Sequence, residues 1–261
     1  MKVGIFANYN KPHSKEIEKT AEKILKSQNI ELLYEESDIY KNSDIIITVG
    51  GDGTIIHHAK KAAIYNKPIL SINAGRIGFL AGLEKEEIDS LKNLINKNYK
   101  TEKRMLLNVS VNNKTYYCLN DAVISKGAIS RMIDLNVCID GGTLHFRSEG
   151  LIAATPTGAT AYSLAAAGPI IDPTVENILI TPICAQSVGA RSLVLNPDSL
   201  IKINVDKKNN TDAFLTIDGE VAIPVDGDII IKKEKEIYVK LIKINDKSFY
   251  KILSEKLKVG E

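Results

Sequence analysis

A carboxylate surrounded by glycines is the first feature of the sequence that could do chemistry. It lies in Gly50-Gly51-Asp52-Gly53-Thr54, between the apolar run "DIIIT" and a helical pattern from Ile55 to Ile64 that Thr54 could cap. A strand, a glycine turn and a helix N-terminus direct backbone N–H groups and the positive end of the helix dipole at one point. We therefore predict a phosphate-binding loop made of Gly50, Gly51, Gly53 and Thr54.

Asp52 needs a chemical reason, because a negative charge beside bound phosphates repels them. The residue is explained if it accepts a proton from an attacking hydroxyl group or helps to hold a magnesium ion. The loop is not a P-loop, since no G-x-x-x-x-G-K-[ST] pattern is present, and the third glycine of G-x-G-x-x-G would fall on Ile56. Asp52 is thus predicted to activate the group that becomes phosphorylated.

Composition narrows the possible partners. The 261 residues are 44% hydrophobic and 25% charged, which is typical of a globular protein, and the net charge of +2 argues against nucleic acid or an anionic membrane as a partner. Without an apolar run long enough for a signal peptide or a membrane span, the sequence predicts a cytoplasmic protein. Cys118, Cys138 and Cys184 are widely spaced, which predicts buried free thiols and no metal site.

Two patterns of hydrophobic periodicity divide the chain. Residues 1–98 alternate strand and helix, which predicts an α/β domain with a parallel sheet. Residues 99–245 change to a period of two and predict a mostly antiparallel β domain, in which "TYYCLNDAVIS" reads as one strand. Residues 246–261 predict a C-terminal helix that packs back on the first domain.

A second polar site is predicted in the β-rich part. Asn120 and Asp121 follow the apolar strand "YYCL", where an isolated Asn-Asp pair fits an Asx turn that ends the strand about as well as a binding site. The segment "TPTGATAYSLAAAGP" (Thr155 to Pro169) combines small residues, hydroxyl groups and one aromatic ring, Tyr162. It is therefore a candidate for binding a nucleoside.

Four motifs in this order resemble the NAD kinase family: "VGGDGT", "NAGRIGFL" (Asn73 to Leu80), "LNDAVIS" and "TPTGATAYSLAAAGPII". The resemblance extends over nearly the whole chain. It implies transfer of the terminal phosphate of ATP or polyphosphate, with Mg²⁺, to the 2′-hydroxyl of the adenosine ribose of NAD, which gives NADP. It assigns the role of proton acceptor to Asp52, and it implies a homodimer or homotetramer in which residues near Glu149 and Ala161 reach a neighbouring site.

The resemblance also assigns a set of residues that bind the dinucleotide. These are Asp52, Gly53, His57, Asn120, Asp121, Arg131, Arg147, Glu149, Thr157, Thr160, Ala161, Tyr162, Ser163, Leu164 and Ala165.

This chain departs from the family's pattern at three places, and its glycine motif also allows two other functions. Glu149 replaces an aspartate, Ala185-Gln186 stands where many members have a histidine, and Glu220 replaces an amide. These differences concern the contacts to nicotinamide and not the phosphorylation chemistry. A lipid or sugar kinase could share the glycine loop but would not need Asn120 and the Thr155 segment. A non-catalytic dinucleotide sensor would gain by losing Asp52.

Overall fold

The computed structural model describes all residues except 76–77, 128–131, 207–211, 246 and 258–261. The chain forms two compact units, residues 1–104 with 237–261 and residues 105–236. These limits differ from the predicted boundaries at 98 and 245, because the strands at residues 100–104 and 239–243 pair with the sheet of the first unit. Arg131, one of the predicted site residues, lies outside the described residues.

The first unit is an α/β domain, as predicted. Its seven-stranded sheet has the order β2-β1-β3-β4-β19-β6, with β5 beside β4 and all pairs parallel except β19 with β6. The strands are β1 (Lys2–Ala7), β2 (Glu31–Leu33), β3 (Ile45–Gly50), β4 (Pro68–Asn73), β5 (Leu83–Glu84), β6 (Lys100–Arg104) and β19 (Val239–Lys243).

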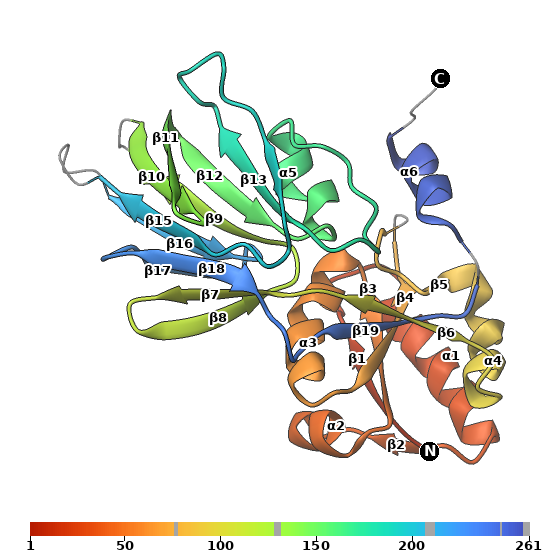
Figure 1. The fold of residues 1–261 in the computed structure, drawn as a ribbon. Helices are drawn as coiled ribbons and strands as arrows, with labels where there is room; N and C mark the ends of the chain where they lie inside the picture. The colour runs from red at the N-terminus through yellow and green to blue at the C-terminus, as the bar shows by residue number, and fades with distance from the viewer. Residues whose placement is uncertain (76–77, 128–131, 207–211, 246, 258–261) are drawn as a thin grey trace. The chain divides into compact units, whose positions relative to one another are not determined.

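Helices cover both faces of this sheet (Figure 1). Ile17, Ala21 and Leu25 of α1 pack on apolar strand residues, as their spacing along one helical stripe predicts. The helices are α1 (Ser14–Ser27), α2 (Glu36–Asn42), α3 (Asp52–Ile64), η1 (Lys85–Ser90), α4 (Leu91–Ile95) and α6 (Phe249–Leu257). The C-terminal helix α6 therefore belongs to the first unit, which confirms the prediction that the chain returns to it.

The second unit is a sandwich of two antiparallel six-stranded sheets, which confirms the predicted fold class. One sheet has the order β11-β10-β15-β18-β7-β8 and the other β14-β13-β12-β9-β16-β17. The first consists of β7 (Leu107–Val111), β8 (Lys114–Cys118), β10 (Ile133–Ile139), β11 (Gly142–Ser148), β15 (Ile201–Val205) and β18 (Ile229–Lys233). The second consists of β9 (Asp121–Lys126), β12 (Gly150–Ala154), β13 (Ile178–Ile183), β14 (Leu193–Leu195), β16 (Ala213–Ile217) and β17 (Val221–Pro224).

Alternate side chains from both sheets form the core of the sandwich, including Val109, Ile124, Leu135 and Leu215. The other face of β12 and β13 is covered by η2 (Gly158–Thr160) and α5 (Tyr162–Ala165), as Figure 1 shows for α5. The segment predicted as one strand at residues 115–125 is instead β8 and β9, which lie in different sheets. The break between them falls at Leu119-Asn120, so the predicted site lies where the chain crosses from one sheet to the other.

The cysteines agree only in part with the prediction of buried free thiols. All three thiols are free, but only Cys118 is buried, whereas Cys138 is half-buried and Cys184 is exposed just after β13.

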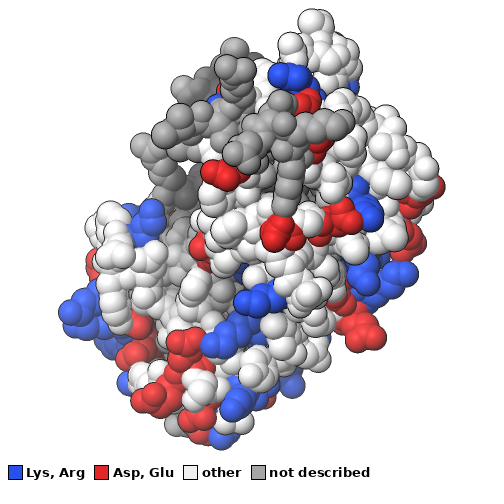
Figure 2. All heavy atoms as spheres, turned by 90° about the vertical axis from the view of Figure 1, so that its left-hand side faces the viewer, with Lys and Arg blue, Asp and Glu red and all other residues white. Residues whose placement is uncertain are grey.

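On the face drawn in Figure 2, basic and acidic side chains lie interspersed among uncharged ones. Among the described residues, no helix has the length and apolar character required to cross a membrane.

Candidate functional site

The glycine loop is shorter than predicted, because α3 begins at Asp52 rather than at Ile55. Gly51 is the N-cap residue, and no side chain caps this helix. The predicted capping role of Thr54 is therefore wrong: Thr54 lies inside the first turn, where its hydroxyl accepts a hydrogen bond from the Asn8 amide at 3.2 Å. Asp52 instead occupies the first helical position, where the helix dipole favours a carboxylate.

The Asp52 carboxylate is fixed by the loop that follows β4. Backbone N–H groups of Phe79 and Leu80 donate to its two oxygens at 3.0 and 3.2 Å. A Cβ atom at Gly78 would lie 2.3 Å from Asp52 Oδ1, so only glycine allows this close approach. The motif "NAGRIGFL" thus serves to hold the carboxylate of the "GGDGT" motif, a function that its sequence did not reveal.

Two glycines leave the approach to the loop open. A Cβ atom built at Gly51 or Gly53 would have no neighbour within 4 Å, whereas one at Gly50 would lie 2.3 Å from Thr54 Oγ1. Gly50 therefore permits local packing, while Gly51 and Gly53 leave the backbone accessible to a ligand. Phosphate binding by this loop stays a prediction.

Asn73 anchors the start of the second loop. This buried residue ends β4, and its amide donates to Glu84 Oε2 at 2.7 Å while its Oδ1 accepts the Gly75 N–H at 3.2 Å. No role was predicted for Asn73, although it begins the motif "NAGRIGFL". Its position opposite Gly50 in the parallel register places both loops at the same edge of the sheet.

The two adjacent histidines of α3 have different surroundings. His57 is exposed, as a ligand contact requires. His58 stacks on Phe6 with ring centroids 4.0 Å apart, and its Nδ1 lies 2.6 Å from the Tyr40 hydroxyl. His58 therefore packs within the unit, whereas His57 remains a candidate for binding the dinucleotide.

In the second unit, Asp218 organises the Asn120-Asp121 segment. Its carboxylate accepts hydrogen bonds from the backbone N–H groups of Leu119 (3.0 Å), Asn120 (2.8 Å) and Asp121 (3.1 Å). The side-chain amide of Asn120 makes no hydrogen bond within the described part of the chain, so it is available to a ligand. Asp218 was not among the predicted site residues, although the neighbouring Glu220 was noted as a departure from the family's pattern.

Asp121 is a buried acid beside a second acid. Its side chain is 5% exposed. Burial, together with the negative charge of Asp218, raises the pKa of Asp121 from 3.8 to about 7. Near neutral pH the carboxyl group therefore exists in both forms and can either donate or accept a hydrogen bond.

The segment after β12 packs on the Asn120 backbone. Thr155 donates its hydroxyl to Leu119 O at 2.5 Å and accepts the Gly158 N–H at 3.1 Å. A Cβ atom at Gly158 would lie 2.1 Å from the carbonyl oxygen of Asn120. Thr155 and Gly158 thus join the two motifs that were predicted to bind one nucleoside.

Tyr162 presents its ring to solvent at the start of α5, with 47% of the residue exposed. Ser163 is different, because it is fully buried and its hydroxyl lies 2.9 Å from Thr181 Oγ1. The Ser163 hydroxyl is therefore occupied by packing within the unit. The other predicted residues of this segment differ in burial. Thr157 is buried, Thr160, Ala161 and Leu164 are half-buried, and Ala165 is exposed.

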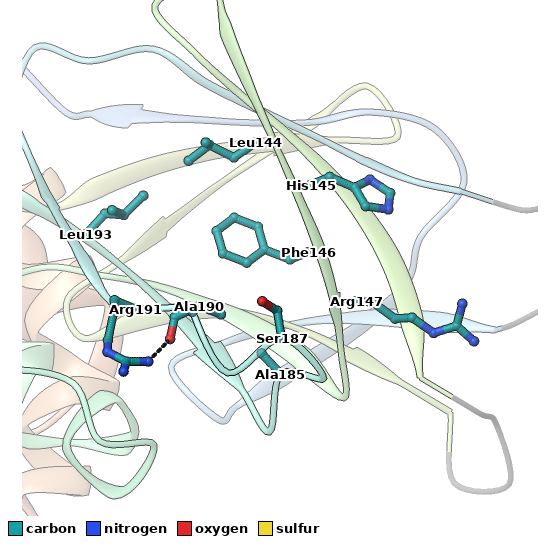
Figure 3. A pocket seen from close by; sticks show the side chains of 10 residues that line it. Leu144, His145, Phe146, Arg147, Ala185, Ser187, Ala190, Arg191 and Leu193 are labelled. Atoms are coloured by element: carbon teal, nitrogen blue, oxygen red, sulfur yellow. Dashed lines mark hydrogen bonds between the residues drawn. The ribbon is translucent and has the colours of Figure 1, made fainter.

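Arg147 and Glu149 lie at the end of β11 and directly after it. Arg147 pairs with Asp134 at 3.6 Å, and Glu149 pairs with Lys126 at 3.5 Å, both at the surface. A cavity of about 300 Å³ opens beside this strand, lined by residues of β11 and of the segment 185–193. Figure 3 shows the Arg147 side chain pointing away from the side of β11 that carries Phe146. Neither Asn120 nor Tyr162 is among the residues that line this cavity.

The described residues include no group of three or more His, Cys, Asp or Glu side chains arranged to hold a metal ion. Asp52 is the carboxylate that the structure places at the glycine loop. A divalent ion there would have to take most of its ligands from phosphate oxygens and water, which is the usual mode for Mg²⁺.

Comparison with known proteins identifies relatives of the whole chain. Residues 36–99 match the family described as ATP-NAD kinase N-terminal domain, and residues 119–244 match the ATP-NAD kinase C-terminal domain. A protein named NAD kinase from Thermoanaerobacter sp. (strain X514) is 38% identical over 280 residues, which cover 98% of each chain. Another NAD kinase, from Caldicellulosiruptor bescii, is 37% identical and covers 99% of this chain and 100% of its own.

Two solved structures have the same fold. Yeast NADH kinase complexed with NADH superposes with a TM-score of 0.87 at 26% identity, covering 100% of this chain and 88% of the other. An NAD kinase from Archaeoglobus fulgidus in complex with ATP superposes with a TM-score of 0.81 at 26% identity, covering 99% of both chains.

The raised pKa of Asp121 predicts a pH-dependent stability. Because the folded-state pKa of about 7 lies above the unfolded value of 3.8, the native state is favoured at low pH, and this stability is lost as the pH rises through 7. Asp121→Asn removes the titration. The free energy of unfolding of the variant relative to the wild type should therefore increase between pH 4 and pH 7, by up to about 1.4 kcal/mol per pH unit, and then level off. Thermal denaturation of both proteins across this range measures the difference, and two parallel curves would contradict it.

Proposed function

The chain belongs to the ATP-NAD kinase family, and we propose that it transfers the terminal phosphoryl group of ATP to the 2′-hydroxyl of the adenosine ribose of NAD. The products are NADP and ADP. The observation that carries this proposal is the Asp52 carboxylate, held at the N-terminus of α3 by two backbone N–H groups beside glycines that leave the loop open.

Asp52 acts as the general base in this reaction. Each of its oxygens already accepts one N–H hydrogen bond, and a carboxylate has about four lone-pair sites, so both oxygens can accept one more. The ribose hydroxyl gives its proton to Asp52 as its oxygen attacks the terminal phosphorus. The bond from that phosphorus to the bridging oxygen breaks, and ADP leaves with the electron pair.

The second unit supplies recognition of the adenosine half of NAD. Asn120 offers an amide, Asp121 a carboxyl group that titrates near neutral pH, and Tyr162 an exposed ring. Asp218 does not touch the substrate in this proposal. It positions Asn120 and Asp121 by accepting their backbone N–H groups.

Mg²⁺ accompanies the phosphate donor, and when bound it neutralises charge on the phosphates. Asp52 is the side chain that would contact it at the loop, while the N–H groups of the loop and the helix dipole would bind phosphate oxygens. ATP is the proposed donor, and polyphosphate remains an alternative. The cytoplasmic location and the homodimer or homotetramer, with contributions near Glu149 and Ala161, also remain predictions.

Replacing Asp52 by asparagine preserves the shape of the side chain and removes the base. We expect turnover, measured as NADP formed from NAD and MgATP, to fall by about 10²- to 10⁴-fold, the range typical of general-base catalysis. NAD binding measured by calorimetry should persist, because the carboxylate is not needed to hold the adenosine. Near-normal turnover would show that Asp52 is not the base, and lost NAD binding would assign it to recognition instead.

Tyr162→Ala should weaken NAD binding by about 1 to 3 kcal/mol, as removal of a ring that stacks on a base does in other proteins. Tyr162→Phe retains the ring and serves as the matched control, which should bind NAD almost as the wild type does. Equal Kd values for NAD in all three proteins, each folded by circular dichroism, would rule out stacking on Tyr162.

A further inference from the structure

The C-terminal helix α6 places a lysine beside the proposed base. Lys256 Nζ lies 3.8 Å from Asp52 Oδ2 and 4.2 Å from the centre of the Phe79 ring. Phe79 is also the residue whose N–H binds Asp52, so the ammonium group, the ring and the carboxylate are neighbours. Nothing in the sequence motifs points to this residue, which follows Asp52 by some two hundred positions.

One face of α6 holds Lys256 in this position. Phe249, Ile252 and Lys256 are spaced by three and four residues and therefore lie on the same side of the helix. The Phe249 ring lies 6.0 Å from the Phe79 ring, and Ile252 is buried and lines a cavity of only about 10 Å³ with Gly78 and Lys243. The helix is thus packed closely on the loop that fixes Asp52.

The phosphate loop lacks the lysine that P-loop proteins use to offset the charge of their nucleotide, and it contains a carboxylate instead. A cation must therefore come from elsewhere if the protein itself is to offset the donor's charge. Lys243 does not meet this need, because its ammonium donates to the carbonyl oxygens of Leu80 and Ala81 at 3.3 and 2.9 Å. Burial also lowers the pKa of this ammonium group to about 8.

Lys256 forms a long ion pair with Asp52, and its ammonium group can still bind a ligand. Its distance of 3.8 Å from Asp52 exceeds the 2.7 to 3.2 Å of a protein N–H···O hydrogen bond, and its side chain remains 28% exposed. An ammonium group has three N–H donors, so it can bind a phosphate oxygen while it stays near the carboxylate.

We propose that Lys256 binds the phosphoryl group that is transferred from the donor. The proposal rests on the proposed function. As the ribose oxygen forms its bond to the terminal phosphorus and the bond to the bridging oxygen of ADP breaks, the ammonium group offsets negative charge on the oxygens of the moving phosphoryl group. The proton of the hydroxyl still goes to Asp52, and Lys256 neither gains nor loses one.

Lys256→Met tests the charge, because methionine preserves an apolar stem that can pack on Phe79. We expect kcat/KM for ATP to fall by about 10- to 100-fold, the equivalent of losing one hydrogen bond to a charged group. The KM for NAD should stay within about twofold of the wild type. Lys256→Arg retains the positive charge and should recover most of the activity.

Lys251→Met is the matched control, since Lys251 is an exposed lysine on the same helix that makes no ion pair with the described residues. Its kinetics should equal those of the wild type. Circular dichroism and Tm establish that each variant is folded, and Lys256→Gln replaces Lys256→Met if the latter is unstable.

Two results would overturn the proposal while leaving the proposed function intact. If the Lys256 variants turn over as the wild type does, the residue only packs on Phe79. If they are faster, Lys256 restrains Asp52 rather than binding phosphate. A wild-type protein that forms no NADP from NAD and MgATP would instead refute the proposed function itself.

Discussion

The hydrogen bonds from Phe79 and Leu80 to the Asp52 carboxylate are the interaction on which the chemistry of the first unit depends. They connect two loops that leave adjacent parallel strands at the same edge of the sheet, where Gly50 pairs with Asn73. Lys243 holds the second loop by donating hydrogen bonds to Leu80 O and Ala81 O. Strand β19, helix α6 and the glycine motifs therefore all act on the position of one carboxylate.

The second unit uses the same type of interaction for a different purpose. Asp218 accepts three backbone N–H groups and so fixes the segment in which Asn120 presents its amide. Thr155 and Gly158 attach the following segment to the same backbone, which orders Tyr162 relative to Asn120 within the unit. A carboxylate that binds main-chain donors thus organises each of the two candidate sites, and we propose a reaction only for Asp52.

The sequence predicted local features well and long-range ones poorly. The alternation of strands and helices in residues 1–98 followed from hydrophobic periodicity alone, and Asp52 was identified because a carboxylate beside bound phosphates needs a chemical role. Asp218 and Lys256 were missed, since each acts on residues about 100 or 200 positions away and no local pattern records such a contact. The start of α3 was misplaced for a related reason: Gly53 argues against a helix by propensity, while the tertiary hydrogen bonds to Asp52 stabilise the first turn there.

We infer that Gly78 and Asp52 act as one unit, because the missing side chain at Gly78 lets the loop hold the carboxylate. The decisive test is a double-mutant cycle in kcat with Gly78→Ala, Asp52→Asn and the double variant. A Cβ atom at Gly78 would press on the terminal atoms of the Asp52 side chain and not on backbone, so the fold should survive while the carboxylate is displaced. We expect Gly78→Ala to slow turnover strongly and the double variant to be no slower than Asp52→Asn. Full activity of Gly78→Ala would contradict this inference. So would a double variant whose fold-loss in kcat is the product of the losses of the two single variants.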